Sequence, residues 1–155
     1  MTTTTMAQLR TIADYQFGSG AGEALFPEDV DLAVHRSASG RPRQVLREGG
    51  RLVTLGTDGR FTLGLEGGRQ LATVLDPAAY RVIVGDESEP FVRDGKNVFA
   101  KFVKAVDEAV RAGDEVLIEH RDGALIAVGR AELDATSMLD FETGMAVKVR
   151  EAACE

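Results

Sequence analysis

The stretch Asp94–Val103, DGKNVFAKFV, stands out in a chain of 155 residues that carries a net charge of −7. Asp94-Gly95 is a turn signal. From Asn97 onward, apolar side chains alternate with alanine or lysine, and this period of two predicts a strand. Alternation assigns the residues to two faces, Val98, Ala100 and Phe102 on one and Phe99 and Lys101 on the other.

Outward from this stretch, residues 77–155 predict a small domain of five strands and two short helices. The first helix has Ser88 as its N-cap, Pro90 in its first turn and Gly95 as its left-handed end. Asp122-Gly123 predicts a tight hairpin turn. Five strands in so short a segment favour a small, nearly closed barrel. We expect strands at 81–85, 97–106, 112–120, 124–133 and 145–151, and a second helix at 135–144.

Residues 1–76 predict a different unit, a helix packed on an antiparallel sheet. Apolar residues spaced for one helical face lie in Gln8–Phe17, at Leu9, Ile12, Ala13 and Phe17. Glycine turns then recur every eight to ten residues between β-rich runs, which indicates a meander. The whole chain is therefore expected to be an α+β protein of two domains, 1–76 and 77–155. We expect strands within 31–37, 43–47, 51–56 and 60–65, and a helix at 68–75.

Composition excludes several classes of protein. Hydrophobic residues make up 44% of the sequence, so a packed core is expected. We see no signal peptide and no apolar run of about 18 residues, the length that a membrane span needs. The single cysteine, Cys154, fits a reducing cytoplasm. Because His35 and His120 have no neighbour at ligand spacing, we expect no metal and no cofactor.

The charge balance at first argues against a nucleic-acid partner. Acidic residues outnumber basic ones 25 to 18, whereas nucleic-acid binding proteins usually show a basic face. Acid-rich and lysine-poor surfaces are, however, typical of proteins in molar salt, where the Debye length falls to about 3 Å and net charge matters only at contact. An ordinary acidic bacterial or archaeal protein remains the alternative. Four of the cations are lysines, Lys96, Lys101, Lys104 and Lys148.

The strings RVIVGDESEPFVRDGKNVFAKFV, GDEVLIEH, LIAVGRAEL and MLDFETGMAVKVR resemble a PUA domain, an RNA-binding module, from Tyr80 to Arg150. Upstream, ADYQFGSGAG, SGRPR and DGRFTLGLEGGRQL are similar to the domain that precedes PUA in archaeosine transglycosylases and archaeosine synthases. These enzymes modify a guanine in the D-arm of archaeal tRNA. The catalytic barrel of the transglycosylase is missing here, and glycine (Gly56) stands where a basic residue is expected.

The resemblance implies a PUA pseudo-barrel whose RNA groove lies between the first helix, the strand after it and the last strand. The chemistry suits this role: a glycine lets a phosphate approach the backbone, asparagine donates and accepts, and cations neutralise phosphates. Taken singly, these residues also fit an ordinary turn, a solvated strand face and core phenylalanines. The candidate RNA-binding residues are Gly95, Lys96, Asn97, Val98, Phe99, Lys101, Arg130, Lys148 and Arg150.

We therefore predict a cytoplasmic RNA-binding protein without catalytic activity of its own. Its expected partners are structured RNA, most plausibly tRNA, and a catalytic subunit of tRNA modification, with no membrane. Two alternatives stay open. In the first, the chain is a subunit of a split archaeosine synthase-like enzyme. In the second, it is a protein-interaction scaffold whose barrel has lost RNA affinity.

Overall fold

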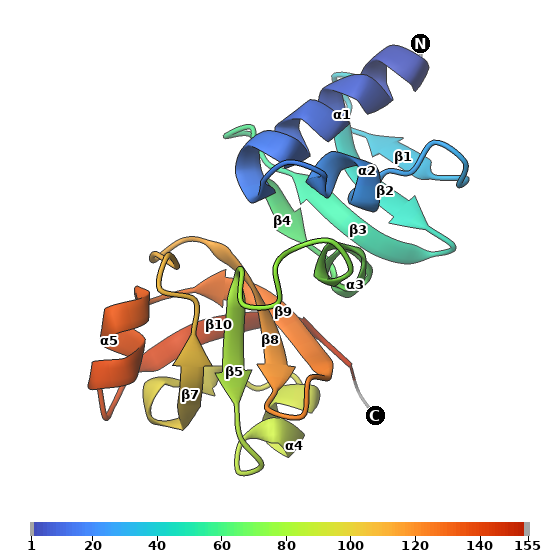
Figure 1. Cartoon of the computed structure of the whole chain (residues 1–155). Coiled ribbons are helices and arrows are strands. Elements are labelled where there is room, and N and C mark those ends of the chain that lie inside the picture. Colours follow the sequence, from blue (N-terminus) through green and yellow to red (C-terminus); the bar gives the residue numbers. More distant parts are fainter. Residues whose placement is uncertain (1, 154–155) are drawn as a thin grey trace. The chain divides into compact units, whose positions relative to one another are not determined.

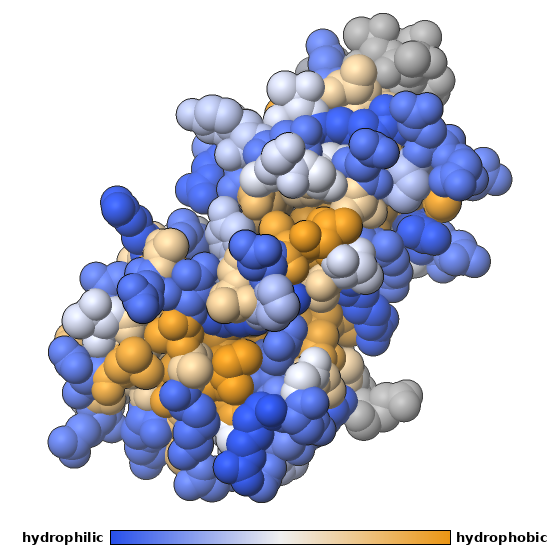
Figure 2. Space-filling view, viewed as in Figure 1, coloured by the Kyte–Doolittle hydropathy of each residue, from blue (hydrophilic) through white to orange (hydrophobic). Residues whose placement is uncertain are grey.

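Two separate β-sheets organise the chain, one on each side of the boundary between Leu75 and Asp76 (Figure 1). The computed structural model describes residues 2–153. No helix within these residues has the length and apolar character to cross a membrane. In Figure 2 hydrophilic side chains dominate the visible face of each unit, and apolar residues form smaller patches among the hydrophilic ones.

The first unit packs three helices against a four-stranded antiparallel sheet with the strand order β1-β2-β3-β4. The structure thus confirms that the first half is a helix packed on an antiparallel sheet. Its elements are α1 (Thr2–Phe17), α2 (Ala21–Leu25), β1 (Ala33–Arg36), β2 (Pro42–Arg47), β3 (Gly50–Leu55), β4 (Phe61–Leu63) and α3 (Leu65–Ala72).

One face of α1 supplies much of the core of the first unit. Leu9, Ala13 and Phe17 recur every fourth residue and are buried, as the spacing predicts. Ile12, which we expected on the same face, is partly exposed. In the same unit, the rings of Phe26 and Phe61 meet edge to face with their centroids 5.8 Å apart.

The edge strand β4 is bonded to α1 through a side-chain amide. Gln16 donates from Nε2 to the carbonyl oxygen of Phe61 at 2.9 Å, and its Oε1 accepts from the Phe61 amide at 2.7 Å. Gln16 therefore satisfies both backbone groups of an edge residue, as a neighbouring strand would.

Two features of the first unit differ from the prediction. Helix α1 begins at Thr2 rather than at Gln8, and α2 (Ala21–Leu25) is a helix that the sequence analysis does not predict. Helix α2 lies very close to α1, because a Cβ on Gly22 would stand 2.4 Å from the carbonyl oxygen of Arg10. This glycine thus serves helix packing as well as chain reversal.

The second unit is a six-stranded sheet in the order β6-β10-β9-β8-β5-β7, curled into a nearly closed barrel (Figure 1). Strands β5 and β8 are parallel and the other neighbours are antiparallel. This arrangement confirms the predicted α+β class and pseudo-barrel. The elements are β5 (Arg81–Val84), α4 (Glu89–Arg93), β6 (Val98–Phe99), the 3-10 helix η1 (Ala100–Phe102), β7 (Val103–Val106), β8 (Glu115–His120), β9 (Leu125–Ala131), α5 (Ala135–Asp140) and β10 (Met145–Ala152).

The single strand predicted at 97–106 is wrong in one respect: Ala100–Phe102 breaks it into β6 and β7. These two pieces are the first and last strands of the sheet order, with β6 on β10 and β7 on β5. The break lets one segment serve both edges, so the sheet can close. An alternating pattern cannot reveal such a break, because the buried Val98 and Ala100 still alternate with the exposed Phe99 and Lys101 as the chain enters it.

Helix α4 ends as the sequence predicts. Gly95 has a φ of 91°, its amide donates to the Val92 carbonyl, and the Lys96 amide donates to the Phe91 carbonyl. These two bonds form a Schellman motif, which favours glycine at its left-handed position. Ser88 stands at the N-cap, but its side chain makes no cap hydrogen bond.

Helix α5 begins with a side-chain cap that the sequence analysis did not identify. The carboxylate of Asp134 accepts a hydrogen bond from the Ser137 amide at 2.8 Å, and this bond lowers the pKa of Asp134. The helix ends at Asp140, four residues before the end that we predicted. Gly144, with a φ of 104°, then turns the chain into β10.

Candidate RNA interface

Two cations face each other across the last two strands of the barrel. Lys148 on β10 and Arg130 on β9 are Cα partners in the antiparallel ladder, and both side chains are exposed. They line a pocket of about 290 Å³ together with Val149 and Arg150. Three of the predicted RNA-binding residues thus come together in one place.

The strands that carry this pocket approach each other closely. A Cβ on Gly129, which pairs with Val149, would lie 2.3 Å from the Lys148 carbonyl oxygen. The register then shifts between Val149 and Glu151, so the strict alternation expected along β10 does not continue to its end. Lys148 lies before this shift and points outward, whereas Ala146 and Val147 are buried.

The three basic side chains of the pocket differ in how far their charge is already balanced. Arg150 donates to the buried Glu115 on β8, with Nη2 2.9 Å from Oε2, so part of its charge is balanced within the protein. Arg130 pairs with Glu132 at 3.0 Å in an exposed ion pair. Lys148 makes no ion pair with the residues that the structure describes. Of the three, Lys148 has the charge most available to a ligand.

Asn97 joins the loop after α4 to this strand. Its Oδ1 accepts a hydrogen bond from the Val149 amide at 2.9 Å. The acceptor oxygen of this candidate RNA-binding residue is therefore used within the protein. Through this bond the loop that contains Gly95 and Lys96 is held beside the pocket.

Replacing Asn97 by alanine should destabilise the barrel by about 1–3 kcal/mol, because the part-buried Val149 amide would lose its acceptor. Urea unfolding followed by circular dichroism measures this loss. Asn97→Asp keeps an acceptor oxygen and is the matched control. Equal losses in both variants would contradict the assigned role of Oδ1.

The other predicted site residues do not line the pocket. Val98 is fully buried, so its side chain belongs to the core. Phe99 is 47% exposed beside Met145 on β10, and Lys101 lies on η1 with its Nζ 5.1 Å from the Phe102 ring centroid. Gly95 and Lys96 are exposed in the loop after α4.

The sequence analysis missed the acidic partners of the pocket. Glu115 opens a strand whose next three residues are buried and apolar, and that position is itself only 5% exposed. A charged residue in such a run signals a buried ion pair. The pattern does not say that the partner is Arg150, 35 residues further along the chain.

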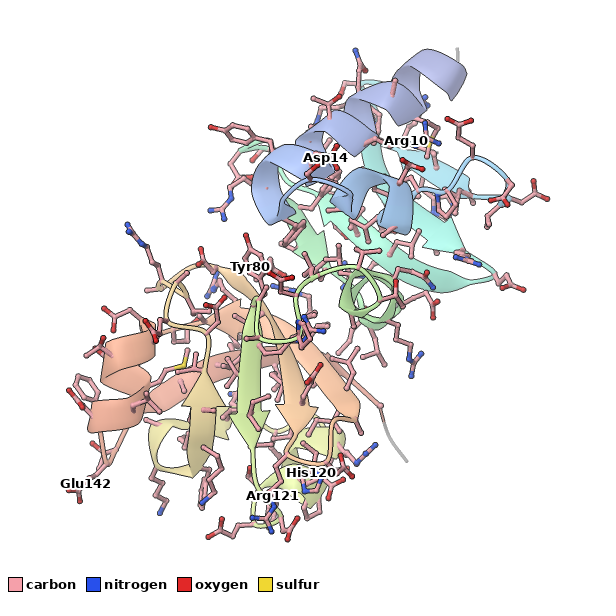
Figure 3. All side chains as sticks on the ribbon, in the orientation of Figure 1. Arg10, Asp14, Tyr80, His120, Arg121 and Glu142 are labelled. Carbon is pink, nitrogen blue, oxygen red and sulfur yellow. The ribbon has the colours of Figure 1, made fainter. Side chains whose placement is uncertain are left out.

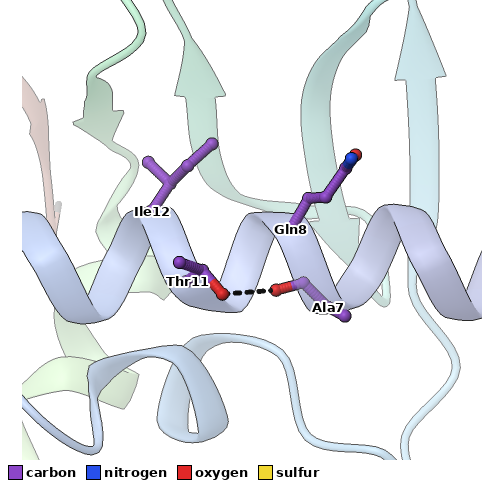
Figure 4. A pocket seen from close by; sticks show the side chains of 4 residues that line it. All are labelled: Ala7, Gln8, Thr11 and Ile12. Atoms are coloured by element: carbon purple, nitrogen blue, oxygen red, sulfur yellow. Dashed lines mark hydrogen bonds between the residues drawn. The ribbon is translucent and has the colours of Figure 1, made fainter.

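A second pocket, on the first unit, is a weaker candidate for a binding site. It lies on the outer side of α1 and is lined by Ala7, Gln8, Thr11 and Ile12 (Figure 4). The Thr11 hydroxyl donates to the Ala7 carbonyl at 3.0 Å, so its hydrogen is already used. These residues carry no charge, and the pocket on β9 and β10 is the better candidate.

Comparison with known families gives one match for each unit. Residues 7–78 match the patch-forming domain C2 of tRNA-guanine transglycosylase, and residues 80–152 match the PUA domain. Both parts of the resemblance seen in the sequence are thereby confirmed.

Curated relatives point to the same class of protein. The chain is 45% identical over 148 residues to a tRNA-guanine(15) transglycosylase of Pyrococcus furiosus, which covers 95% of this chain and 25% of the relative. It is 46% identical over 145 residues to the enzyme of the same name from Methanothermobacter thermautotrophicus, covering 93% and 22%. The chain thus spans about a quarter of the length of these relatives.

Solved structures share the fold at low sequence identity. A hypothetical protein from Pyrococcus horikoshii superposes with a TM-score of 0.75 at 20% identity, covering 100% of this chain and 93% of the other. A conserved PUA domain protein from Thermoplasma acidophilum gives 0.64 at 20% identity, covering 94% and 91%. These structures therefore share the fold of this chain.

Proposed function

Since residues 7–78 match the patch-forming domain C2 of tRNA-guanine transglycosylase and residues 80–152 match the PUA domain, we propose that the chain binds structured RNA, and tRNA in particular. The contact surface is the pocket on β9 and β10. The observation that carries the proposal is the cross-strand pair of Arg130 and Lys148, whose exposed side chains line one pocket on an otherwise acidic chain.

The chemistry of this pocket suits a sugar-phosphate backbone. Lys148 brings a positive charge that no described carboxylate neutralises, and Arg130 adds planar donors on the neighbouring strand. Structured RNA is recognised mainly by its shape, its phosphates and its 2′-hydroxyl groups. Val149 supplies an apolar surface between the cations, against which a ribose can pack.

The loop after α4 extends the contact surface. The hydrogen bond between Asn97 and Val149 holds this loop beside the pocket, so Lys96 can contact the RNA next to it. The Nδ2 donors of Asn97 remain available to the ligand. Gly95 leaves room beside the loop, because no atom lies within 4 Å of the place a Cβ would take. Phe99 and Lys101 serve a more distant nucleotide.

The chain docks RNA and leaves the chemistry of modification to another subunit. The four residues that line the pocket include no carboxylate, thiol, hydroxyl or imidazole that could act as nucleophile or general base. The chain also covers about a quarter of the transglycosylases it matches, which supports a catalytic partner in trans. With this function it acts in the cytoplasm, and its acid-rich, lysine-poor composition supports a cytoplasm of high salt.

Salt dependence tests the proposal. Labelled tRNA is titrated with protein from about 0.1 M to about 1 M KCl while fluorescence anisotropy is recorded. We expect log Kd to rise linearly with log salt, and Lys148→Ala to reduce the slope by about 1, because one phosphate contact is lost. An unchanged slope in Lys148→Ala would remove this residue from the interface.

The same preparation separates the alternatives. If neither tRNA nor ribosomal RNA binds at any salt concentration, the barrel is a protein-interaction scaffold. If the purified chain alone converts a tRNA carrying a modified guanine, it is a subunit of an archaeosine synthase-like enzyme. Binding without turnover supports the docking function.

A further inference from the structure

Three side chains from separate parts of the sequence meet at the start of α4. Asp86 follows β5, Glu89 is the first residue of α4, and His120 ends β8. The Nε2 atom of His120 lies 2.6 Å from Oδ1 of Asp86 and 3.7 Å from Oε1 of Glu89. One ligand atom of each residue lies within 4.8 Å of the others. Figure 3 shows His120 and Arg121 beside α4 at this end of the barrel.

Each carboxylate accepts a hydrogen bond from an arginine through the oxygen that does not face His120. Arg121 donates to Oδ2 of Asp86 at 2.7 Å, and Arg93 donates to Oε2 of Glu89 at 2.9 Å. The remaining oxygens, Oδ1 and Oε1, are the ones that face His120. Bonds of this kind orient the ligands of metal sites in proteins.

The imidazole of His120 is supported in the same way. The residue is 8% exposed, and its Nδ1 lies 3.0 Å from Oδ1 of Asp122 without a well-formed hydrogen bond. A carboxylate at Nδ1 favours the tautomer whose lone pair is on Nε2, the nitrogen that points at the two carboxylates. Ser88, between Asp86 and Glu89 in the chain, also has a buried hydroxyl without a described partner. The Ser88 hydroxyl is thus a buried polar group that lacks a hydrogen bond among the described residues.

We propose that Asp86, Glu89 and His120 bind a divalent transition-metal ion of the Zn²⁺ class. One imidazole nitrogen and two carboxylate oxygens are a donor set that Zn²⁺ accepts, with water for a fourth position. The ion replaces the proton that bridges these groups in the metal-free protein. In that state Asp86, Asp122 and Glu89 raise the pKa of His120, and His120 and Arg121 lower the pKa of Asp86.

The position of the site gives the ion a structural role. It connects the turn between β8 and β9 to the first turn of α4, and α4 ends at the Gly95 loop beside the pocket. A bound ion therefore fixes the first turn of this short helix, whose last turn leads into the Gly95 loop. The sequence conceals the site, because Asp86 and His120 are 34 residues apart.

Calorimetric titration with Zn²⁺ tests the inference on the full chain. The Cys154→Ser variant, without a histidine tag, removes the thiol as a competing ligand, and a slightly alkaline buffer keeps more of the imidazole neutral. We expect one Zn²⁺ per chain and a change of the His120 Nε2 resonance in ¹⁵N spectra. Asp122→Asn should weaken the affinity about 10–100-fold, since it removes the support at Nδ1.

Two further variants complete the test. Asp86→Asn with Glu89→Gln keeps the shapes of the side chains and should abolish the titration. Glu87→Gln, which alters an exposed carboxylate paired with Lys104, is the matched control and should leave it unchanged. If the parent protein takes up no Zn²⁺, or if the double variant binds as well as the control, the cluster is a proton-bridged ion pair and the inference is wrong. The tRNA titration of the metal-free protein is independent of this outcome.

Discussion

The double variant Arg130→Glu, Lys148→Glu is expected to bind tRNA about 100-fold more weakly than the parent chain at moderate salt. Each reversal removes a cation and brings an anion against the phosphates, at a cost of about 1–3 kcal/mol per contact. Because the two residues are partners across the β9–β10 ladder, one RNA backbone meets both. Fluorescence anisotropy with labelled tRNA measures the loss, which should shrink as KCl is raised.

A charge reversal elsewhere on the barrel provides the control. Lys104 is an exposed lysine on β7, which pairs with β5 and does not line the pocket, and Lys104→Glu changes the net charge as much as either reversal in the pocket. It should reduce affinity by less than about threefold, through net charge alone. An equal loss in Lys104→Glu and Lys148→Glu would mean that binding follows overall charge, and the pocket would no longer be the site.

Gly129→Ala is expected to cause the largest loss of stability, about 3 kcal/mol or more. A Cβ at this position would stand 2.3 Å from the Lys148 carbonyl oxygen and 3.1 Å from Cγ1 of Val147. Backbone of an inner strand pair cannot move aside without breaking ladder bonds on both sides of β9. Urea unfolding measures the loss, and tRNA affinity should fall with it because the β10 side of the pocket moves.

Gly85→Ala separates close packing from the general effect of replacing glycine. Its Cβ would meet Cε of Lys104 at 2.8 Å, but that atom is near the end of a flexible, exposed side chain. We expect a change within about 0.5 kcal/mol. If Gly129→Ala were equally mild, β9 and β10 would not be packed as closely as the structure shows.

Local sequence patterns predicted most of the elements because each depends on neighbouring residues. The glycine after α4 was identified from the Asp94-Gly95 pair, and its φ of 91° follows from the same chemistry. Arg130 and Lys148 were both candidates before the fold was known, and the antiparallel pairing of β9 and β10 brings them together. Alternation found the exposed Lys148 because β10 pairs regularly with β9 from Val147 to Val149.

The rest depends on contacts between residues that are distant in sequence. Arg150 alternates outward like Lys148, but only the fold shows that Glu115 balances its charge. His120 has no ligand at helical or hairpin spacing, yet the parallel pairing of β5 with β8 carries it to Asp86. The break at Ala100–Phe102 is likewise a result of barrel closure, which no local pattern encodes.

The bond between Gln16 and the edge strand β4 has a consequence for self-association. Another copy of the chain that tried to extend the first sheet by adding a strand to β4 would find the donor and acceptor of Phe61 occupied. The opposite edge, β1, carries exposed residues such as Ala33 and His35. Oligomers or fibrils that grow by strand addition to this sheet would therefore have to form through β1, and substitutions there, rather than on β4, are the ones to choose for improving solubility.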